Sequence, residues 1–280
     1  MSRKSLERLL KPKSIAIVGG GAWCRNVIKT CKSIGFDGDI WPVHPTKTSI
    51  EGLQAYPTIE DLPSAPDSSF LGVNRNATVK CLTSLSKSDA GGAVCFASGF
   101  AEASAEIKDG ANLQARLLQA AGDMPFLGPN CYGFLNYLDG CALWPDQHGG
   151  QRVESGVAII TQSSNIAINL TMQNRAVPLA YVVTAGNQAQ TDLPEIGMDL
   201  LRDPRVTCLG LHIEGINDIR ALEHLAHLSH ELKKPICVLK VGKSDQAQLA
   251  SVSHTASLAG SHTGASALIN RLGFAQVDDL

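Results

Sequence analysis

The chain has 280 residues, of which 44% are hydrophobic and 18% are charged, and its net charge is -2. This length accommodates one large or two medium domains, and the apolar content suffices for a buried core. The nearly balanced charge argues against nucleic-acid binding, which normally requires a basic stripe. Apolar runs fall short of the ~18 residues of a membrane span, and no apolar region follows the basic N-terminus, so we expect neither a membrane association nor a signal peptide.

The pattern of the cysteines argues against disulfides, and that of the clustered histidines argues against a metal site. The eight cysteines contain no C-x-x-C pair, and several lie inside apolar runs such as GAVCFAS and PICVLK. Free buried thiols are typical of a reducing compartment, so we expect a cytoplasmic protein. His224, His227 and His230 lie opposite the apolar face of a predicted helix, and no carboxylate or cysteine cluster completes a set of ligands. We therefore expect no metal site.

Short apolar runs alternate with helix-length amphipathic stretches along the chain. The first half predicts strand 14–18, helix 22–34, strand 39–43, helix 58–62, strand 70–73, helix 76–87, strand 92–97, helix 104–121 and strand 125–128. After the polar connector WPDQHGGQRVESG the alternation resumes with strand 157–161, helix 163–175, strand 179–185, helix 192–202, strand 207–213, helix 217–232 and strand 235–240. This pattern predicts an α/β protein with doubly wound parallel sheets, in two domains at residues 1–148 and 149–280. Ligands of such folds lie beyond the carboxyl ends of the strands.

A run of three glycines at residues 19–21 joins the first strand to a helix. A tight glycine turn lets the backbone approach a pyrophosphate, although Cys24 occupies the third glycine position of G-x-G-x-x-G. The second strand ends in VHPTK (43–47), without the acidic residue that holds the ribose of NAD. Lys47 would suit a phosphate on the ribose, which leaves NADP or coenzyme A. A surface lysine after a turn-forming proline explains it equally well.

Five stretches of the first half carry a family resemblance: KPKSIAIVG (11–19), VHPTK (43–47), GLQAYPTIEDLP (52–63), ASGFAE (97–102) and LGPNCYG (127–133). They resemble the CoA-binding domain of NDP-forming acyl-CoA synthetases, whose superfamily includes the α subunit of succinyl-CoA synthetase. The resemblance covers essentially the whole chain and implies a Rossmann-like CoA-binding domain followed by a flavodoxin-like, succinyl-CoA synthetase-type domain. The implied CoA site contains these residues: Gly19, Gly20, Gly21, Pro45, Lys47, Ser98, Gly99, Asn130 and Cys131. The chain departs from the family in a shorter loop after Gly21 and in Asn74, where proline is common.

The stretch SVSHTASLAGSHTG (251–264) contains Ser-His-Thr twice. His254 and His262 both lie among small residues that leave an imidazole accessible, so composition does not choose between them. Ser261 is a typical N-cap for the apolar stretch that follows, which places His262 in a first helical turn. The family motif Ser-His-Thr-Gly-x-Leu-Ala-Gly matches residues 253–260 with one glycine replaced by alanine. The resemblance therefore implies that His254 is the nucleophile that carries a phosphoryl group.

Two further sites follow strand ends of the second half. Glu214 follows strand 207–213, where a carboxylate can accept a hydrogen bond from an imidazole and fix its tautomer. Ser163, Ser164 and Asn165 begin a helix, whose free N–H groups can bind an anion. The resemblance implies that Glu214 orients the histidine and that this helix start holds the phosphoryl group. An exposed loop glutamate and ordinary helix capping are also compatible with the sequence.

The resemblance implies an acid–CoA ligase that forms a thioester from a carboxylic acid, coenzyme A and ATP through phosphorylated His254 and an acyl phosphate. ATP or ADP with Mg²⁺ is expected on an ATP-grasp domain or subunit, which the 280 residues do not show, so we expect no ATP-dependent ligation by this chain alone. Both a fused chain and a two-chain enzyme fit, as do homo- and hetero-oligomers. A non-catalytic CoA-binding regulatory module is an alternative. An NADP-dependent oxidoreductase is a weaker one, because no acid/base group for hydride transfer is evident.

Overall fold

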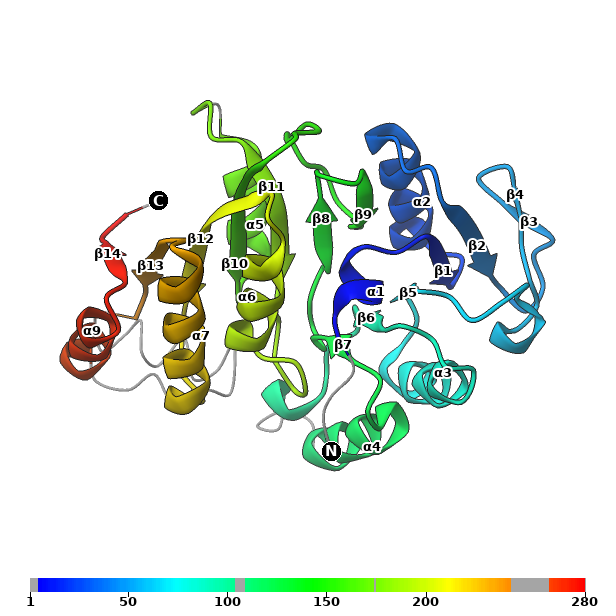
Figure 1. Cartoon of the computed structure of the whole chain (residues 1–280). Coiled ribbons are helices and arrows are strands. Elements are labelled where there is room, and N and C mark those ends of the chain that lie inside the picture. The colour runs from blue at the N-terminus through cyan, green and yellow to red at the C-terminus, as the bar shows by residue number, and fades with distance from the viewer. Residues whose placement is uncertain (1–4, 104–108, 174, 243–261, 280) are drawn as a thin grey trace.

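Figure 1 shows a computed structural model of the chain, in which two α/β units lie side by side. The structure describes residues 5–103, 109–173, 175–242 and 262–279. Within these residues, the first unit has a parallel sheet with the order β2-β1-β5-β6-β7. Its strands are β1 (Ser14–Val18), β2 (Asp39–Val43), β5 (Ser68–Leu71), β6 (Ala93–Cys95) and β7 (Phe126–Leu127). Helix α2 (Ala22–Ile34) packs on one face of this sheet, and α3 (Arg75–Lys87) and α4 (Gly110–Ala121) pack on the other.

The second unit has a larger sheet, ordered β14-β13-β12-β10-β11-β8-β9 within the described residues. Its parallel strands are β10 (Gly156–Thr161), β11 (Leu179–Thr184), β12 (Val206–Ile213), β13 (Ile236–Lys240) and β14 (Ala275–Val277). Two antiparallel strands, β8 (Phe134–Asn136) and β9 (Cys141–Leu143), form one edge. The helices of this unit are α5 (Ser164–Thr171), α6 (Leu193–Arg202), α7 (Ile219–Leu232) and α9 (His262–Arg271).

The parallel strands of both sheets follow one spatial order. Numbered along the chain, they run 2-1-3-4-5 in each sheet: β2-β1-β5-β6-β7 and β11-β10-β12-β13-β14. In such a doubly wound sheet the connections leave in opposite directions on either side of the first strand, which opens a crevice at the carboxyl ends. The crevices therefore lie between β1 and β5 and between β10 and β12. These are the positions where the sequence predicts the glycine turn and the helix start.

Strands β8 and β9 connect the two units. They fall inside the range expected for the first domain, yet Phe134 pairs with Val183 of β11 in the second sheet. Helix α2 of the first unit packs against them, and the thiol of Cys31 donates to the carbonyl oxygen of Ala142 at 2.9 Å. One hydrophobic cluster runs from β1 and α2 through these strands to β12 and β13. The two units therefore share a core, which fixes their facing loops relative to one another.

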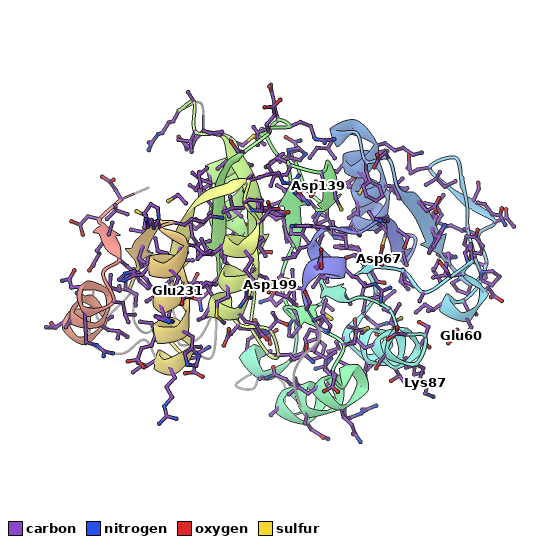
Figure 2. The ribbon with its side chains drawn as sticks, viewed as in Figure 1. Glu60, Asp67, Lys87, Asp139, Asp199 and Glu231 are labelled. Atoms are coloured by element: carbon purple, nitrogen blue, oxygen red, sulfur yellow. The ribbon has the colours of Figure 1, made fainter. Side chains whose placement is uncertain are left out.

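The N-terminal segment adds polar contacts between the units. In it lies the short helix α1 (Glu7–Leu10), and the N–H of Leu6 donates to Asp199 of α6 at 2.7 Å. Arg8 pairs with Asp67, which directly precedes β5, at 2.7 Å. Asp67 and Asp199 are labelled in Figure 2. The N-terminal segment therefore contacts both units.

The predicted alternation of strands and helices is confirmed, with local differences. The helix expected at 58–62 is a 3₁₀ turn, η1 (Ile59–Asp61), and α5 ends at Thr171, before the expected residue 175. A second 3₁₀ turn, η2 (Ala101–Ala103), precedes α4, and the start expected for α4 at residue 104 falls outside the described residues. Elements that were not predicted are α1, β3 (Ser49–Ile50), β4 (Leu53–Gln54), β8, β9 and β14. In the part of the chain that the structure describes, none of the helices combines the length and apolarity needed to cross a bilayer.

Candidate active site between the two sheets

A cavity of about 760 Å³ lies where the carboxyl ends of both sheets face one another. The loops after β5, β6 and β7 line it from the first unit, and the loops after β10, β11 and β12 line it from the second. Eight residues predicted from the sequence lie in this lining: Ser98, Gly99, Asn130, Cys131, Ser163, Ser164, Asn165 and Glu214. The structure thus brings together groups that are more than a hundred positions apart. The cavity is referred to below as the central cavity.

The start of helix α5 presents its first turn to the central cavity. Ser163 is the N-cap, and its side chain accepts from the N–H of Ile166 at 3.5 Å. Thr161, the last residue of β10, accepts from the N–H of Ser163 at 3.0 Å. The side chain of Ser164 accepts from the N–H of Tyr132 at 3.2 Å, which joins this turn to the first unit. A helix start held in this way can bind an anion without rearrangement.

The loop that carries Glu214 is fixed by two buried polar side chains. The Gln162 side chain is 5% exposed; its carbonyl oxygen accepts from the backbone N–H groups of Glu214 and Gly215, the latter at 3.1 Å. Its amide group donates to the carbonyl oxygen of Gly215 at 3.3 Å. From β13, the Lys240 ammonium donates to the carbonyl oxygen of Glu214 at 3.0 Å, and burial lowers the Lys240 pKa. Neither Gln162 nor Lys240 was predicted; the only sequence signal was a polar residue at the end of an apolar strand.

A buried histidine contacts Thr161, which in turn binds the N-cap of α5. His212 is 5% exposed, and its Nδ1 lies 3.1 Å from the hydroxyl of Thr161. Burial lowers the pKa of His212 to about 4, and the charge of nearby Lys240 acts in the same direction. The imidazole is therefore neutral at neutral pH. The contact that holds Thr161, and through it Ser163, is a hydrogen bond between uncharged groups.

The loop after β11 packs against the Gly-Pro-Asn turn of the first unit. Gly186 has φ +56°, and a Cβ there would lie 2.5 Å from the carbonyl oxygen of Pro129, so the close approach requires glycine. The N–H of Asn187 donates to the same carbonyl oxygen at 3.0 Å. Its side-chain amide donates to Glu102 at 2.5 Å, and Glu102 also accepts from the N–H of Gly99 at 2.7 Å. These contacts set the width of the central cavity.

A second cavity of about 540 Å³ lies between β1 and β5 and is referred to as the glycine crevice. Gly19, Gly20 and Pro45 line it, and the Lys47 ammonium donates to the carbonyl oxygen of Gly20 at 3.0 Å. Gly21 is the N-cap of α2. Residues 72–74 line both cavities, so a long ligand bound at the glycine turn can extend into the central cavity.

The predicted nucleophile, His254, lies outside the described residues, together with residues 251–261 around it. Helix α9 begins at His262, which agrees with the expected first helical turn there. On the other side of the gap, β13 ends at Lys240, beside the backbone of Glu214. The roles predicted for His254 and Glu214 remain predictions.

Comparison with known proteins matches this arrangement in two parts. Residues 13–137 match a family model described as a CoA binding domain, and residues 154–280 match one described as a succinyl-CoA ligase like flavodoxin domain. The fold and the site thus define a protein with a CoA-binding unit joined to a ligase-type flavodoxin unit.

Curated relatives and a solved structure align with nearly the whole chain. A trans-feruloyl-CoA synthase from an unknown prokaryotic organism is 29% identical over 289 residues, which cover 100% of this chain and 41% of the relative. Acetate–CoA ligase [ADP-forming] II of Archaeoglobus fulgidus is 30% identical, with 91% and 38% covered. The structure of a dinucleotide forming acetyl-coenzyme A synthetase 1 of Ca. Korarchaeum cryptofilum, in complex with phosphate and ADP, superimposes with a TM-score of 0.86 at 27% identity, covering 99% of this chain and 60% of that one.

The two units belong to the domain families that these models describe, and the chain as a whole is similar to ADP-forming acyl-CoA ligases. It spans about two fifths of the length of the two curated relatives, 41% and 38%.

Proposed function

We propose that the chain is the CoA-binding and phosphohistidine part of an ADP-forming ligase that makes an acyl-CoA thioester from a carboxylic acid, CoA and ATP. The observation that carries this proposal is the junction of the two cavities at residues 72–74. A CoA nucleotide at the glycine turn then has a direct path for its thiol to the start of α5 and to Glu214.

The glycine crevice is the proposed site of the CoA nucleotide. The Lys47 ammonium donates to the carbonyl oxygen of Gly20 in the glycine turn, and Lys80 of α3 lines the crevice. Both ammonium groups suit a ligand that carries a pyrophosphate and a ribose phosphate. The residues present therefore fit coenzyme A better than NAD, which would call for a carboxylate at the end of β2.

The chemistry is proposed to run through His254. An imidazole nitrogen of His254 attacks the terminal phosphorus of ATP, and ADP leaves. A carboxylate oxygen of the acid then takes the phosphoryl group, giving an acyl phosphate and free imidazole. The CoA thiolate attacks the acyl carbon, and inorganic phosphate leaves. Glu214 orients the imidazole, and the N–H groups at the start of α5 stabilise the charge on the transferring phosphoryl group.

ATP and Mg²⁺ are proposed to bind on an ATP-grasp domain or partner subunit. The length of the relatives supports this, because about three fifths of each relative lies outside the match to this chain. A reducing, cytoplasmic location is proposed on the basis of the cysteines. All eight are free, and burial raises the pKa values of the Cys31 and Cys131 thiols to about 12.

Two histidine variants in the complete ligase test the proposal. With radiolabelled ATP, the wild type and His262→Ala should acquire acid-labile phosphate on the peptide that contains residue 254, and His254→Ala should acquire none. Thioester formation should fall with phosphorylation in His254→Ala only. Unchanged thioester formation by His254→Ala would show that the chain is a CoA-binding module without a catalytic role.

A further inference from the structure

Three aromatic side chains meet at the border of the central cavity and form what is called here the aromatic wall: Trp23, Phe96 and Tyr132. They come from the start of α2 and from the loops after β6 and β7. The ring of Phe96 lies 5.5 Å from that of Trp23 and 5.7 Å from that of Tyr132, and Trp23 and Tyr132 are 6.2 Å apart, centroid to centroid. Each ring therefore contacts both of the others.

Two buried aromatic rings pack against the aromatic wall on the side of the protein core. Phe70 of β5 lies 5.6 Å from Phe96, and Trp144 lies 5.5 Å from Tyr132 in an edge-to-face arrangement. Phe70 and Trp144 are both fully buried, whereas Trp23 is 43% exposed. The wall therefore combines a rigid base with aromatic surface that is left open to a ligand. Exposed apolar surface of this kind, rimmed by polar groups, is characteristic of a binding site.

The aromatic wall lies next to the proposed reaction centre. Phe96 and Tyr132 line the central cavity together with Ser164 and Glu214. The backbone N–H of Tyr132 donates to the side chain of Ser164 at 3.2 Å, so the wall is one hydrogen bond away from the start of α5. An acid whose carboxylate meets the phosphoryl group at that helix start would place the remainder of its molecule against the wall.

We propose that the aromatic wall binds the ring of the substrate, and that the substrate class is an aromatic carboxylic acid. The proposal rests on the proposed function, because the reacting carboxylate must meet the phosphoryl group at this helix start. Offset or edge-to-face contact between aromatic rings stabilises a complex beyond the area it buries, whereas a two-carbon acid would leave the wall uncovered. The cavity, at about 760 Å³, can hold an aromatic acyl group together with the thiol end of CoA.

Binding of thioesters to this chain tests the proposal without ATP, because the product carries the acyl group already joined to CoA. Isothermal titration calorimetry compares CoA, acetyl-CoA and benzoyl-CoA. We expect benzoyl-CoA to bind about tenfold more tightly than acetyl-CoA, a difference of about 1.4 kcal/mol. Trp23→Leu and Tyr132→Leu should remove most of this difference and leave the affinity for CoA itself within about twofold. Leu232→Ala, which shortens an exposed apolar side chain at the end of α7, is the matched control and should change neither affinity.

The outcomes separate the two proposals. If CoA itself does not bind, the proposed function is contradicted. If CoA binds and benzoyl-CoA binds no more tightly than acetyl-CoA, the aromatic substrate class is overturned while the proposed function stands. If Trp23→Leu weakens the binding of all three ligands equally, the wall holds CoA and not the acid, which also overturns the inference.

Discussion

Replacing Gln162 by methionine tests whether this side chain fixes the loop of Glu214. Methionine keeps the approximate length and volume but cannot accept from the N–H groups of Glu214 and Gly215, nor donate to the carbonyl oxygen of Gly215. The change leaves three backbone groups without this partner, and each unpaired buried group costs about 1–3 kcal/mol. Part of this cost is offset because the buried side-chain amide is removed at the same time. We expect the free energy of unfolding to fall by about 2–4 kcal/mol.

Urea titration of the whole chain measures this loss, and hydrogen exchange of the Glu214 and Gly215 amides locates it. Gln173→Met is the matched control. Gln173 is exposed, so this change should stay within about 0.5 kcal/mol of the wild type. In Gln162→Met the two amides should exchange faster than they do in the wild type, with the amides of the neighbouring strand β12 as the internal reference. Unchanged stability together with unchanged exchange at these amides would refute the assignment of Gln162 as the residue that holds this loop.

Two further predictions concern buried ionisable groups. Because burial lowers the pKa of His212 to about 4 from 6.5, the unfolded chain takes up the proton first as the pH falls. This contribution to stability is complete above pH 6.5 and is lost toward pH 4, by at most about 3 kcal/mol, and His212→Gln should flatten the slope in urea titrations at successive pH values. Asp203 is 1% exposed and pairs with Lys11 at 2.8 Å and Arg205 at 2.9 Å, which hold the pKa of its carboxyl group far below the usual range. Since both partners are about a third exposed, Asp203→Asn should lower stability at pH 7 by about 2 kcal/mol, and an unchanged melting temperature would contradict this role.

The sequence predicts the sheets and much of the site because both depend on local patterns. Strand β1 is buried along its whole length, and such continuous apolar runs are typical of parallel strands covered on both faces. Parallel strands also bring their carboxyl ends to one edge. Residues within two positions of the end of a predicted strand, such as Ser163 and Glu214, are therefore expected near one another, and both line the central cavity.

The remaining features depend on contacts that no local pattern contains. Strands β8 and β9 have three residues each, and their place in the second sheet is decided by pairing with β11 and packing against α2. The burial of Gln162 depends on a loop more than fifty positions further along the chain. Trp23 looks like an isolated exposed aromatic residue in the sequence. Its neighbours Phe96 and Tyr132 join it only because β6 and β7 end at the same edge of the sheet as β1, which leads through the glycine turn into α2.

Every proposed step depends on the binding of CoA at the glycine crevice, and calorimetry with two glycine variants measures that binding. A Cβ at Gly20 would lie 2.4 Å from the ring of His44 and 3.0 Å from the ammonium of Lys47, whereas a Cβ at Gly210, in β12 and outside the crevice lining, would have its nearest neighbour at 3.4 Å, an ordinary contact distance. The wild type and Gly210→Ala should therefore bind CoA with similar affinity and more tightly than they bind NADP, and Gly20→Ala should bind CoA at least about tenfold more weakly. Equal binding of CoA by the two variants, or tighter binding of NADP by the wild type, would show that CoA does not bind at this turn.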